Sequence, residues 1–207
     1  MPGHPGERQP GHNPQGQYRP VEFQPYQGTT QNFPTWSVFT TMTSYFETYD
    51  MLRRLASHNP GGMGNVRRAV IGTVEHWKTG KPTAHAEAAR VLVQGFMMNG
   101  VRRVEWTPVV DTLRGERELV GEVNELTGLA YELLSQTDWK TTIQGEKDLT
   151  DADMKMRDWL EAQCFTWVDK LVARQHTGSV GTFANTVLDI YLQAVDWQRV
   201  TNGLRGK

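Results

Sequence analysis

The sequence predicts an all-α protein, a single helical domain of about six helices that follows an extended N-terminal arm. From residue 33 onward, apolar residues recur at steps of three and four, which places them on one face of a helix. No stretch alternates apolar and polar residues as a strand would. No apolar run approaches the length of a membrane span, and the first residues lack the apolar core of a secretory signal. We therefore expect a soluble, cytoplasmic protein that is not bound to a membrane.

Residues 1–32 have the composition of a flexible arm rich in Pro, Gly and Gln. Six of the ten prolines lie there, and such a segment buries too little apolar surface to offset the entropy of ordering it. Three spaced aromatic residues, Tyr18, Phe23 and Tyr26, are candidates for docking the arm on its own domain or on a partner. The alternative is a disordered tail.

The first half of the helical domain, residues 33–207, contains three expected helices. The domain opens at Phe33-Pro34-Thr35-Trp36, and aromatic and apolar spacing predicts a helix over 36–57. A glycine-rich run then precedes a second helix over 65–78. A third helix begins at the potential cap Thr83 and stops at Asn99-Gly100.

Three further helices are expected in the second half. Thr107-Pro108 is a start signal, and the apolar seam that follows runs from Leu119 to Leu133. Thr150-Asp151-Ala152-Asp153 opens the next helix, with acidic residues where the helix dipole favours them. Its apolar face includes Cys164, which we expect to pack as a small hydrophobe. The last helix holds the apolar residues between Phe183 and Ala194.

Three short segments have a common pattern of a branched residue, an acid and a tryptophan. They are Val104-Glu105-Trp106, Thr137-Asp138-Trp139 and Val195-Asp196-Trp197. The acid can cap the next turn while the indole fills the corner between helices. We interpret Glu105, Trp106, Asp138, Trp139, Asp196 and Trp197 as structural helix junctions.

The first and third junctions suggest an internal repeat. Each follows a long aromatic-rich helix and a shorter one, so residues 33–110 and 150–204 are candidates for two copies of one helical unit. The alternative is that a tryptophan at a helix corner is a common packing device.

The two ends of the helical domain resemble a group of uncharacterised helical proteins carried by bacterial plasmids and phages. The resemblance lies in Phe33-Pro34-Thr35-Trp36 and Val195-Asp196-Trp197. The chain departs from the group at Tyr45-Phe46-Glu47-Thr48, where the group has an Asn-Asp-Glu turn. The resemblance implies an accessory protein of a phage or mobile element, and it implies no reaction.

Charge is unevenly distributed along the chain. Residues 31–110 carry nine basic and five acidic groups, net +4, whereas residues 111–207 carry eleven and sixteen, net −5. Three arginine pairs stand in the basic part, and guanidinium groups suit phosphate and carboxylate. We take Arg53, Arg54, Arg67, Arg68, Arg102 and Arg103 as candidate anion- or partner-binding residues. The alternative is that they pair internally or are simply solvated.

No catalytic or metal-binding motif is present in the sequence. The glycine-rich run lacks the Gly-Lys-Ser/Thr of a P-loop, and the six histidines are scattered. We therefore expect no catalytic residue, no metal and no cofactor. The first hypothesis is a non-enzymatic phage or mobile-element accessory protein that binds a host or viral protein. The alternative is a nucleic-acid-associated accessory protein that uses the arginine pairs, and an enzyme is the third hypothesis.

Overall fold

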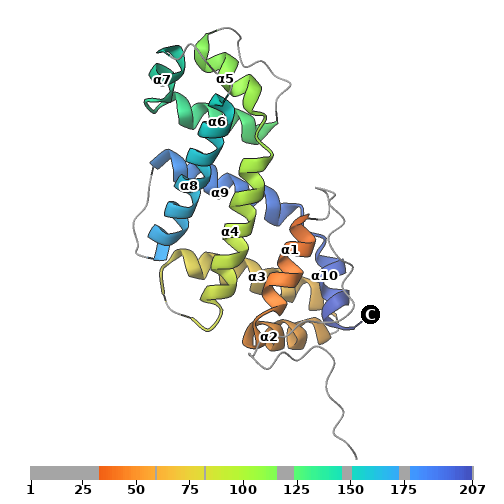
Figure 1. Ribbon diagram of the computed structural model, residues 1–207. Helices are drawn as coiled ribbons and strands as arrows, with labels where there is room; N and C mark the ends of the chain where they lie inside the picture. The colour runs from red at the N-terminus through yellow and green to blue at the C-terminus, as the bar shows by residue number, and fades with distance from the viewer. Residues whose placement is uncertain are drawn as a thin grey trace, which may run out of the picture. The chain divides into compact units, whose positions relative to one another are not determined.

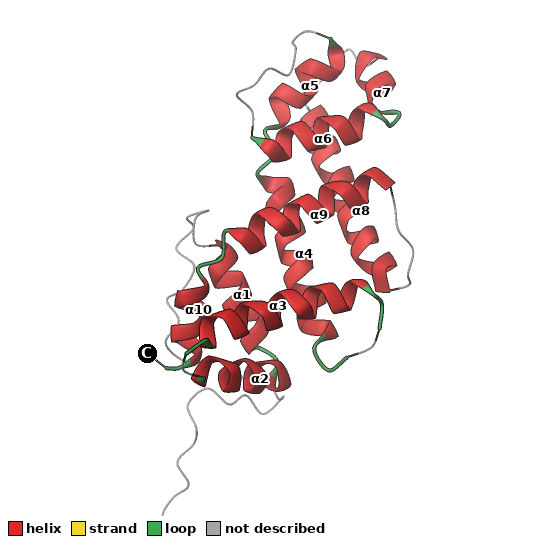
Figure 2. Ribbon diagram, turned by 180° about the vertical axis from the view of Figure 1, so that it is seen from behind, coloured by secondary structure: helices red, strands yellow, loops and turns green. Residues whose placement is uncertain are grey.

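The computed structural model describes residues 33–58, 60–81, 83–115, 124–145, 151–172 and 178–206. These residues form ten helices and no strand, which confirms the all-α prediction (Figures 1 and 2). No helix in the described part of the chain is long and apolar enough to cross a membrane. The arm residues Tyr18, Phe23 and Tyr26 lie outside the described residues. The helices are α1 Phe33–Thr43, α2 Phe46–Ser57, α3 Gly62–Lys78, α4 Ala86–Arg102, α5 Trp106–Arg114, α6 Glu125–Ser135, α7 Trp139–Gly145, α8 Ala152–Val172, α9 Gly178–Gln193 and α10 Trp197–Leu204.

The chain divides into two compact units. Unit 1 consists of Met1–Leu92 and Leu192–Lys207, and unit 2 of Val93–Tyr191. These bounds cross the expected repeats 33–110 and 150–204, because the C-terminal helix α10 packs against α1, α2 and α3 (Figure 1). The repeat therefore stays a prediction.

The prediction of one continuous helix over 36–57 is wrong, because this segment forms two helices, α1 and α2. Three hydroxyl groups near the break bond backbone carbonyls one turn back: Thr40 to Trp36, Thr43 to Phe39 and Ser44 to Thr40, at 2.6–2.7 Å. Such side-chain bonds compete with the helix and bend it. Tyr45 then adopts an extended conformation, with φ −110° and ψ 118°.

Two expected boundaries in the next helices are also wrong. Helix α3 begins at Gly62, before the expected residue 65, because Gly61 turns the chain with a left-handed φ of 108°. Helix α4 runs through Asn99-Gly100 to Arg102. Gly100 serves packing there, since an added Cβ would lie 2.9 Å from Val187 Cγ1.

The seam expected from Leu119 to Leu133 lies partly outside the described residues, and its described part is the short helix α6. Helix α5 ends before this seam, at Arg114, because the C-cap Gly115 has a left-handed φ of 80°. Asn124 caps the start of α6, where its Oδ1 accepts a 3.0 Å hydrogen bond from the Thr127 N–H. Because α1 and α2 are separate helices, as are α5 and α6, the described residues contain more helices than the expected six.

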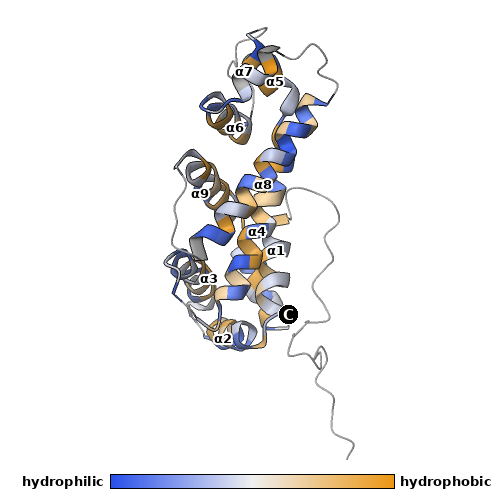
Figure 3. Ribbon diagram, turned by 60° about the vertical axis from the view of Figure 1, so that its left-hand side comes forward, coloured by the Kyte–Doolittle hydropathy of each residue, from blue (hydrophilic) through white to orange (hydrophobic). Residues whose placement is uncertain are grey.

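Each of the three Glu/Asp-Trp segments lies at the start of a short helix. Helices α5, α7 and α10 begin at Trp106, Trp139 and Trp197. Only Trp197 is buried, with 8% of its surface exposed. Figure 3 shows hydrophobic and hydrophilic residues interspersed along α8, and its buried residues Met156, Leu160, Cys164 and Trp167 recur at steps of three and four.

Candidate functional site

Two of the three arginine pairs lie on either side of one corner of unit 1. Arg53 and Arg54 occupy the last turn and a half of α2, and Arg67 and Arg68 lie in the second turn of α3. Only residues 58–61 separate the two helices, which pack against each other. All four side chains are exposed. The two arginine pairs thus flank the turn between α2 and α3.

A fifth arginine reaches the same corner from the far end of the sequence. Arg205, which follows α10, donates from Nε to the Ala56 carbonyl at 2.5 Å and from Nη2 to the His58 carbonyl at 3.3 Å. A cation that bonds the last carbonyls of a helix is favoured by the helix dipole. We call Arg53, Arg54, Arg67, Arg68 and Arg205 the basic corner.

The shape of the corner depends on Gly62. A Cβ at this position would lie 2.5 Å from the Ala56 carbonyl oxygen and 2.6 Å from Nη2 of Arg205. Any larger residue would therefore push α3 away from the end of α2 or displace Arg205. The glycine lets the start of α3, the end of α2 and the Arg205 guanidinium meet closely.

Apart from the C-terminal carbonyls of α2, which Arg205 binds, little negative charge opposes the corner. Asp50 pairs with Arg54 at 2.6 Å, but 76% of the arginine side chain and 40% of the aspartate are exposed. Water screens such a pair strongly. Arg68 donates to the amide oxygen of Asn65 at 2.5 Å, which leaves its charge uncompensated. Within the described part of the chain, the guanidinium groups of Arg53 and Arg67 have no ion pair.

The start of α3 adds a partial positive charge. Its first turn contains no acidic residue, and the N-cap Gly61 offers no side-chain acceptor. The N–H groups of the first turn therefore carry the positive end of the helix dipole toward the corner. Together with the arginines, they give this surface the electrostatics that phosphate groups prefer.

The third arginine pair is not part of the corner. Arg102 ends α4 and Arg103 follows it, both in unit 2. The Arg103 guanidinium lies 5.9 Å from the centre of the Tyr191 ring, a cation–π distance, and its carbonyl accepts a hydrogen bond from Asn124 at 3.1 Å. Arg103 is therefore engaged within unit 2.

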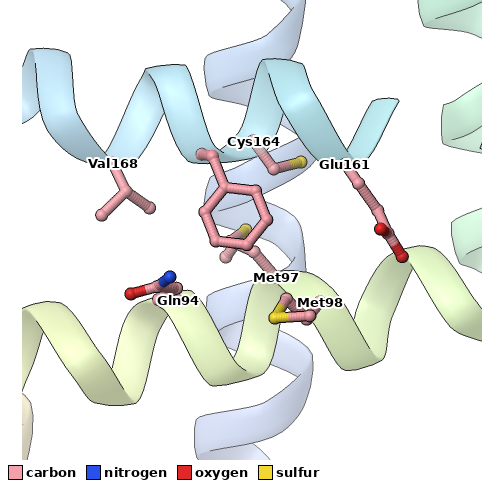
Figure 4. Close-up of a pocket in the computed structure, with 7 residues that line it drawn as sticks. Gln94, Met97, Met98, Glu161, Cys164 and Val168 are labelled. Atoms are coloured by element: carbon pink, nitrogen blue, oxygen red, sulfur yellow. The ribbon is translucent and has the colours of Figure 1, made fainter. Parts of the chain in front are cut away.

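A hollow in unit 2 lies between α4 and α8, and Figure 4 shows its side chains. It has no space for a water molecule, so it is a packing seam and not a ligand cavity. Burial and, to a smaller extent, the nearby Glu161 carboxylate together raise the pKa of the Cys164 thiol to about 12. The thiol is thus protonated near neutral pH and unsuited to nucleophilic attack. The lining residues are Gln94, Met97, Met98, Glu161, Cys164, Phe165 and Val168.

Histidines and carboxylates do not converge on a metal site in the described part of the chain, where no group of three or more potential ligands is found. His85 instead bonds Thr48, with 2.9 Å between Nδ1 and Oγ1. Thr48 is fully buried, so this histidine satisfies a core hydroxyl.

Sequence reasoning found the two arginine pairs but missed Arg205 and Gly62. Arg205 is separated from Ala56 by 149 residues, and no local signal links them. Gly62 belongs to the glycine-rich run that precedes the second expected helix, and no local signal shows that this glycine is needed for a close contact. A comparison with protein-family models, curated proteins and solved structures finds no match for the chain.

Proposed function

We propose that the protein is a non-enzymatic binding protein whose basic corner holds the phosphate backbone of a nucleic acid. The observation that carries the proposal is the convergence of five arginines and an uncapped helix start on one corner of unit 1, opposed by one exposed carboxylate. Phosphate contacts of this kind supply most of the affinity of non-specific nucleic-acid binding.

The number of arginines in the basic corner determines how strongly nucleic-acid binding should depend on salt. Each phosphate neutralised by a Lys or Arg contributes about −0.9 to the salt slope on duplex DNA. Two arginines removed from the corner should therefore lower the slope by about 2, and weaken binding regardless of sequence. Weak, salt-sensitive binding to both single-stranded and duplex probes is the expected behaviour.

The test compares two double variants of the full chain. Fluorescence anisotropy measures binding to labelled duplex DNA, single-stranded DNA and RNA over a range of salt concentrations. Arg67→Ala with Arg68→Ala should reduce affinity by about tenfold or more at low salt and flatten the slope. Arg102→Ala with Arg103→Ala removes the same charge from unit 2 and should change affinity much less. Absence of binding at low salt, or equal losses in both variants, would refute the proposal.

Protein–protein interaction is the second candidate function, as expected of a phage or mobile-element accessory protein acting on a host or viral protein. Three large apolar side chains stand half exposed: Phe46 at 50%, Met63 at 44% and Met154 at 46%. Methionine adapts readily to different partner surfaces. Replacing Phe46 and Met63 by Ser should abolish capture of such a partner while leaving the arginines and salt-dependent nucleic-acid binding unchanged.

A further inference from the structure

The outer side of α3 combines exposed positive charge with little side-chain bulk. Gly64, Arg68 and Gly72 recur at steps of four, so they lie on one side of the helix. Arg68 and Gly72 are exposed, Gly64 is half-exposed, and the exposed Arg67 lies beside Arg68. The buried valines of α3 lie on the opposite side, where the helix packs against α2 and α10. We call Gly64, Arg67, Arg68 and Gly72 the outer face of α3.

The two glycines of this face are not explained by the rest of the described chain. A Cβ at Gly64 or Gly72 would meet no atom of the described residues within 4 Å, whereas one at Gly62 would clash. Neither glycine has the left-handed φ that Gly61 adopts. Glycine inside a helix is unfavourable relative to alanine, because it loses more backbone freedom on folding. What glycine does provide at these positions is room for another molecule to approach the helix backbone closely.

The charge of the outer face indicates which molecule this is. Arg67 and Arg68 are exposed, and no carboxylate of the described residues forms an ion pair with either. The start of α3 adds the positive end of the helix dipole. A second copy of the chain would place Arg68 against Arg68 across a two-fold axis, so repulsion disfavours a homodimer through this face. The face is therefore complementary to a polyanion.

The sign of the charge changes after Gly72. Glu75 lies on the same side of α3 about one turn further on, and 57% of its side chain is exposed. Its carboxylate pairs with Lys78 Nζ at 2.9 Å. The acid limits the contact with a polyanion to the part of α3 that precedes it. From Gly64 to Gly72 this part is about 12 Å long, at about 1.5 Å per residue.

We propose that this part of α3 lies in the major groove of duplex DNA. The inference rests on the proposed nucleic-acid binding and names the form of nucleic acid that the basic corner prefers. The major groove of B-form DNA is about 12 Å wide and admits an α-helix, whereas that of duplex RNA is deep and narrow. The glycines let the helix backbone approach the base edges, while Arg67 and Arg68 reach the phosphates beside the groove. Because the glycines have no side chain to read a base, the contact selects the form of the duplex and not one sequence.

The first experiment adds bulk to the outer face without changing its charge. Gly64→Gln with Gly72→Gln projects two uncharged side chains from it. The control is Gly128→Gln in α6 of unit 2, where the Cβ position is equally open among the described residues. Fluorescence anisotropy of the full chain measures binding to duplex DNA, duplex RNA and single-stranded DNA of one sequence, at about 50 mM salt, where screening is weak. Thermal unfolding followed by circular dichroism checks that each variant keeps its fold.

The wild-type chain should bind duplex DNA about tenfold more tightly than duplex RNA, because only the DNA groove admits the helix. The double glutamine variant should unfold at or above the wild-type temperature, since glutamine is the better helix former. Its affinity for duplex DNA should fall about tenfold, while its affinity for single-stranded DNA stays within about twofold, because the clash arises only in the groove. The Gly128 variant should bind all three probes like the wild type. Equal wild-type affinity for both duplexes, or a double variant that binds duplex DNA normally, overturns the proposal.

A second measurement uses the wild-type chain and depends on no variant. Methyl green occupies the major groove of DNA, and netropsin occupies the minor groove. The protein should displace methyl green from duplex DNA at concentrations that leave netropsin bound. Displacement of netropsin as readily as methyl green, or of neither dye, overturns the proposal.

Failure of this inference and failure of the proposed function give different results. A wild-type chain that binds no nucleic acid at low salt refutes the proposed function, and the groove contact with it. A chain that binds all three probes alike, and loses affinity for all of them in Arg67→Ala with Arg68→Ala, keeps the proposed function and refutes the groove contact alone.

Discussion

Unit 1 and unit 2 use the same hydrogen bond at the start of a short helix. In unit 1 the Asp196 N–H donates to Thr35 Oγ1 at 2.9 Å, and in unit 2 the Glu105 N–H donates to Thr127 Oγ1 at 2.9 Å. Thr35 is the third residue of α1 and Thr127 is the third residue of α6. Both threonines are buried. In each unit, a threonine in the first turn of one helix thus anchors the chain where an acid and a tryptophan begin another.

The two junctions differ in what the acidic side chain does. Asp196 caps its own helix, because its Oδ1 accepts from the Arg199 N–H at 3.0 Å. Glu105 makes no such cap, and its Oε1 accepts instead from Asn124 Nδ2 at 2.8 Å. The longer glutamate reaches across to the start of α6, whereas the shorter aspartate bends back to its own turn. In unit 1 one residue, Asp196, caps the start of the short helix. In unit 2 the corresponding glutamate instead takes part in a network of hydrogen bonds with Asn124 and Thr127.

The largest difference between the junctions is expected at the tryptophans. Trp197→Ala should lower the free energy of unfolding by about 3–5 kcal/mol, because it empties a buried site in unit 1. Trp106→Ala should cost clearly less, because Trp106 is only half-buried. Urea unfolding followed by circular dichroism measures both changes. Equal losses in the two variants would show that burial does not distinguish the junctions.

Gly62 and Gly64 provide the next test within unit 1. Gly62→Ala should cost about 2–3 kcal/mol, because the new Cβ meets the fixed Ala56 carbonyl oxygen. Gly64→Ala is the matched control on the same helix, since nothing lies within 4 Å of its Cβ position, and it should stabilise the protein by up to about 1 kcal/mol. Thermal unfolding of the two variants should shift in opposite directions. A stable Gly62→Ala variant would contradict the close approach of α2 and α3.

The shared threonine bond gives a direct comparison of the two units. Thr35→Val and Thr127→Val keep the side-chain shape but leave the Asp196 or Glu105 N–H without its acceptor, at a cost of about 1–2 kcal/mol. Thr127→Val should cost more, because its hydroxyl also bonds Asn124 Oδ1 at 3.1 Å. Chemical denaturation measures the losses, and Thr35→Ser and Thr127→Ser should restore most of the stability. If the serine variants are as unstable as the valine variants, the methyl group and not the hydroxyl carries the effect.

The smallest expected effects come from the acids themselves. Asp196→Ala removes a helix cap and should cost about 1 kcal/mol. Glu105→Ala removes only an exposed hydrogen bond to Asn124 and should cost less than about 0.5 kcal/mol. Hydrogen exchange of the first-turn amides of α10 and α5 reports the two junctions separately. A larger acceleration of α5 exchange by Glu105→Ala than of α10 exchange by Asp196→Ala would reverse the assignment of the cap.

Apolar periodicity and capping signals predicted that the chain is helical, but they failed where other contacts determine where a helix ends. The all-α fold, the burial of Cys164 and the acidic start of α8 follow from periodicity and capping. The break after Thr43 and the continuation of α4 through Gly100 do not. The first depends on hydroxyls that bond the preceding turn, and the second on the approach of Val187 to a glycine.

The candidate site was predicted in part for the same reason. Adjacent arginines are visible in the sequence, and two pairs do meet at one corner of unit 1. The third pair lies in unit 2, where Arg103 lies at a cation–π distance from Tyr191. No spacing rule could place Arg205 at the end of α2, because the contact joins residues far apart in the chain.

By itself, the sequence determined the helices and the uneven charge, because both are properties of neighbouring residues. Only the tertiary structure decided that the C-terminal helix α10 joins α1, α2 and α3, and so brings Arg205 to the basic corner. Which helices pack against each other is determined by how well their buried faces fit together. That selection depends on shape and burial across more than a hundred residues, which short-range patterns do not encode.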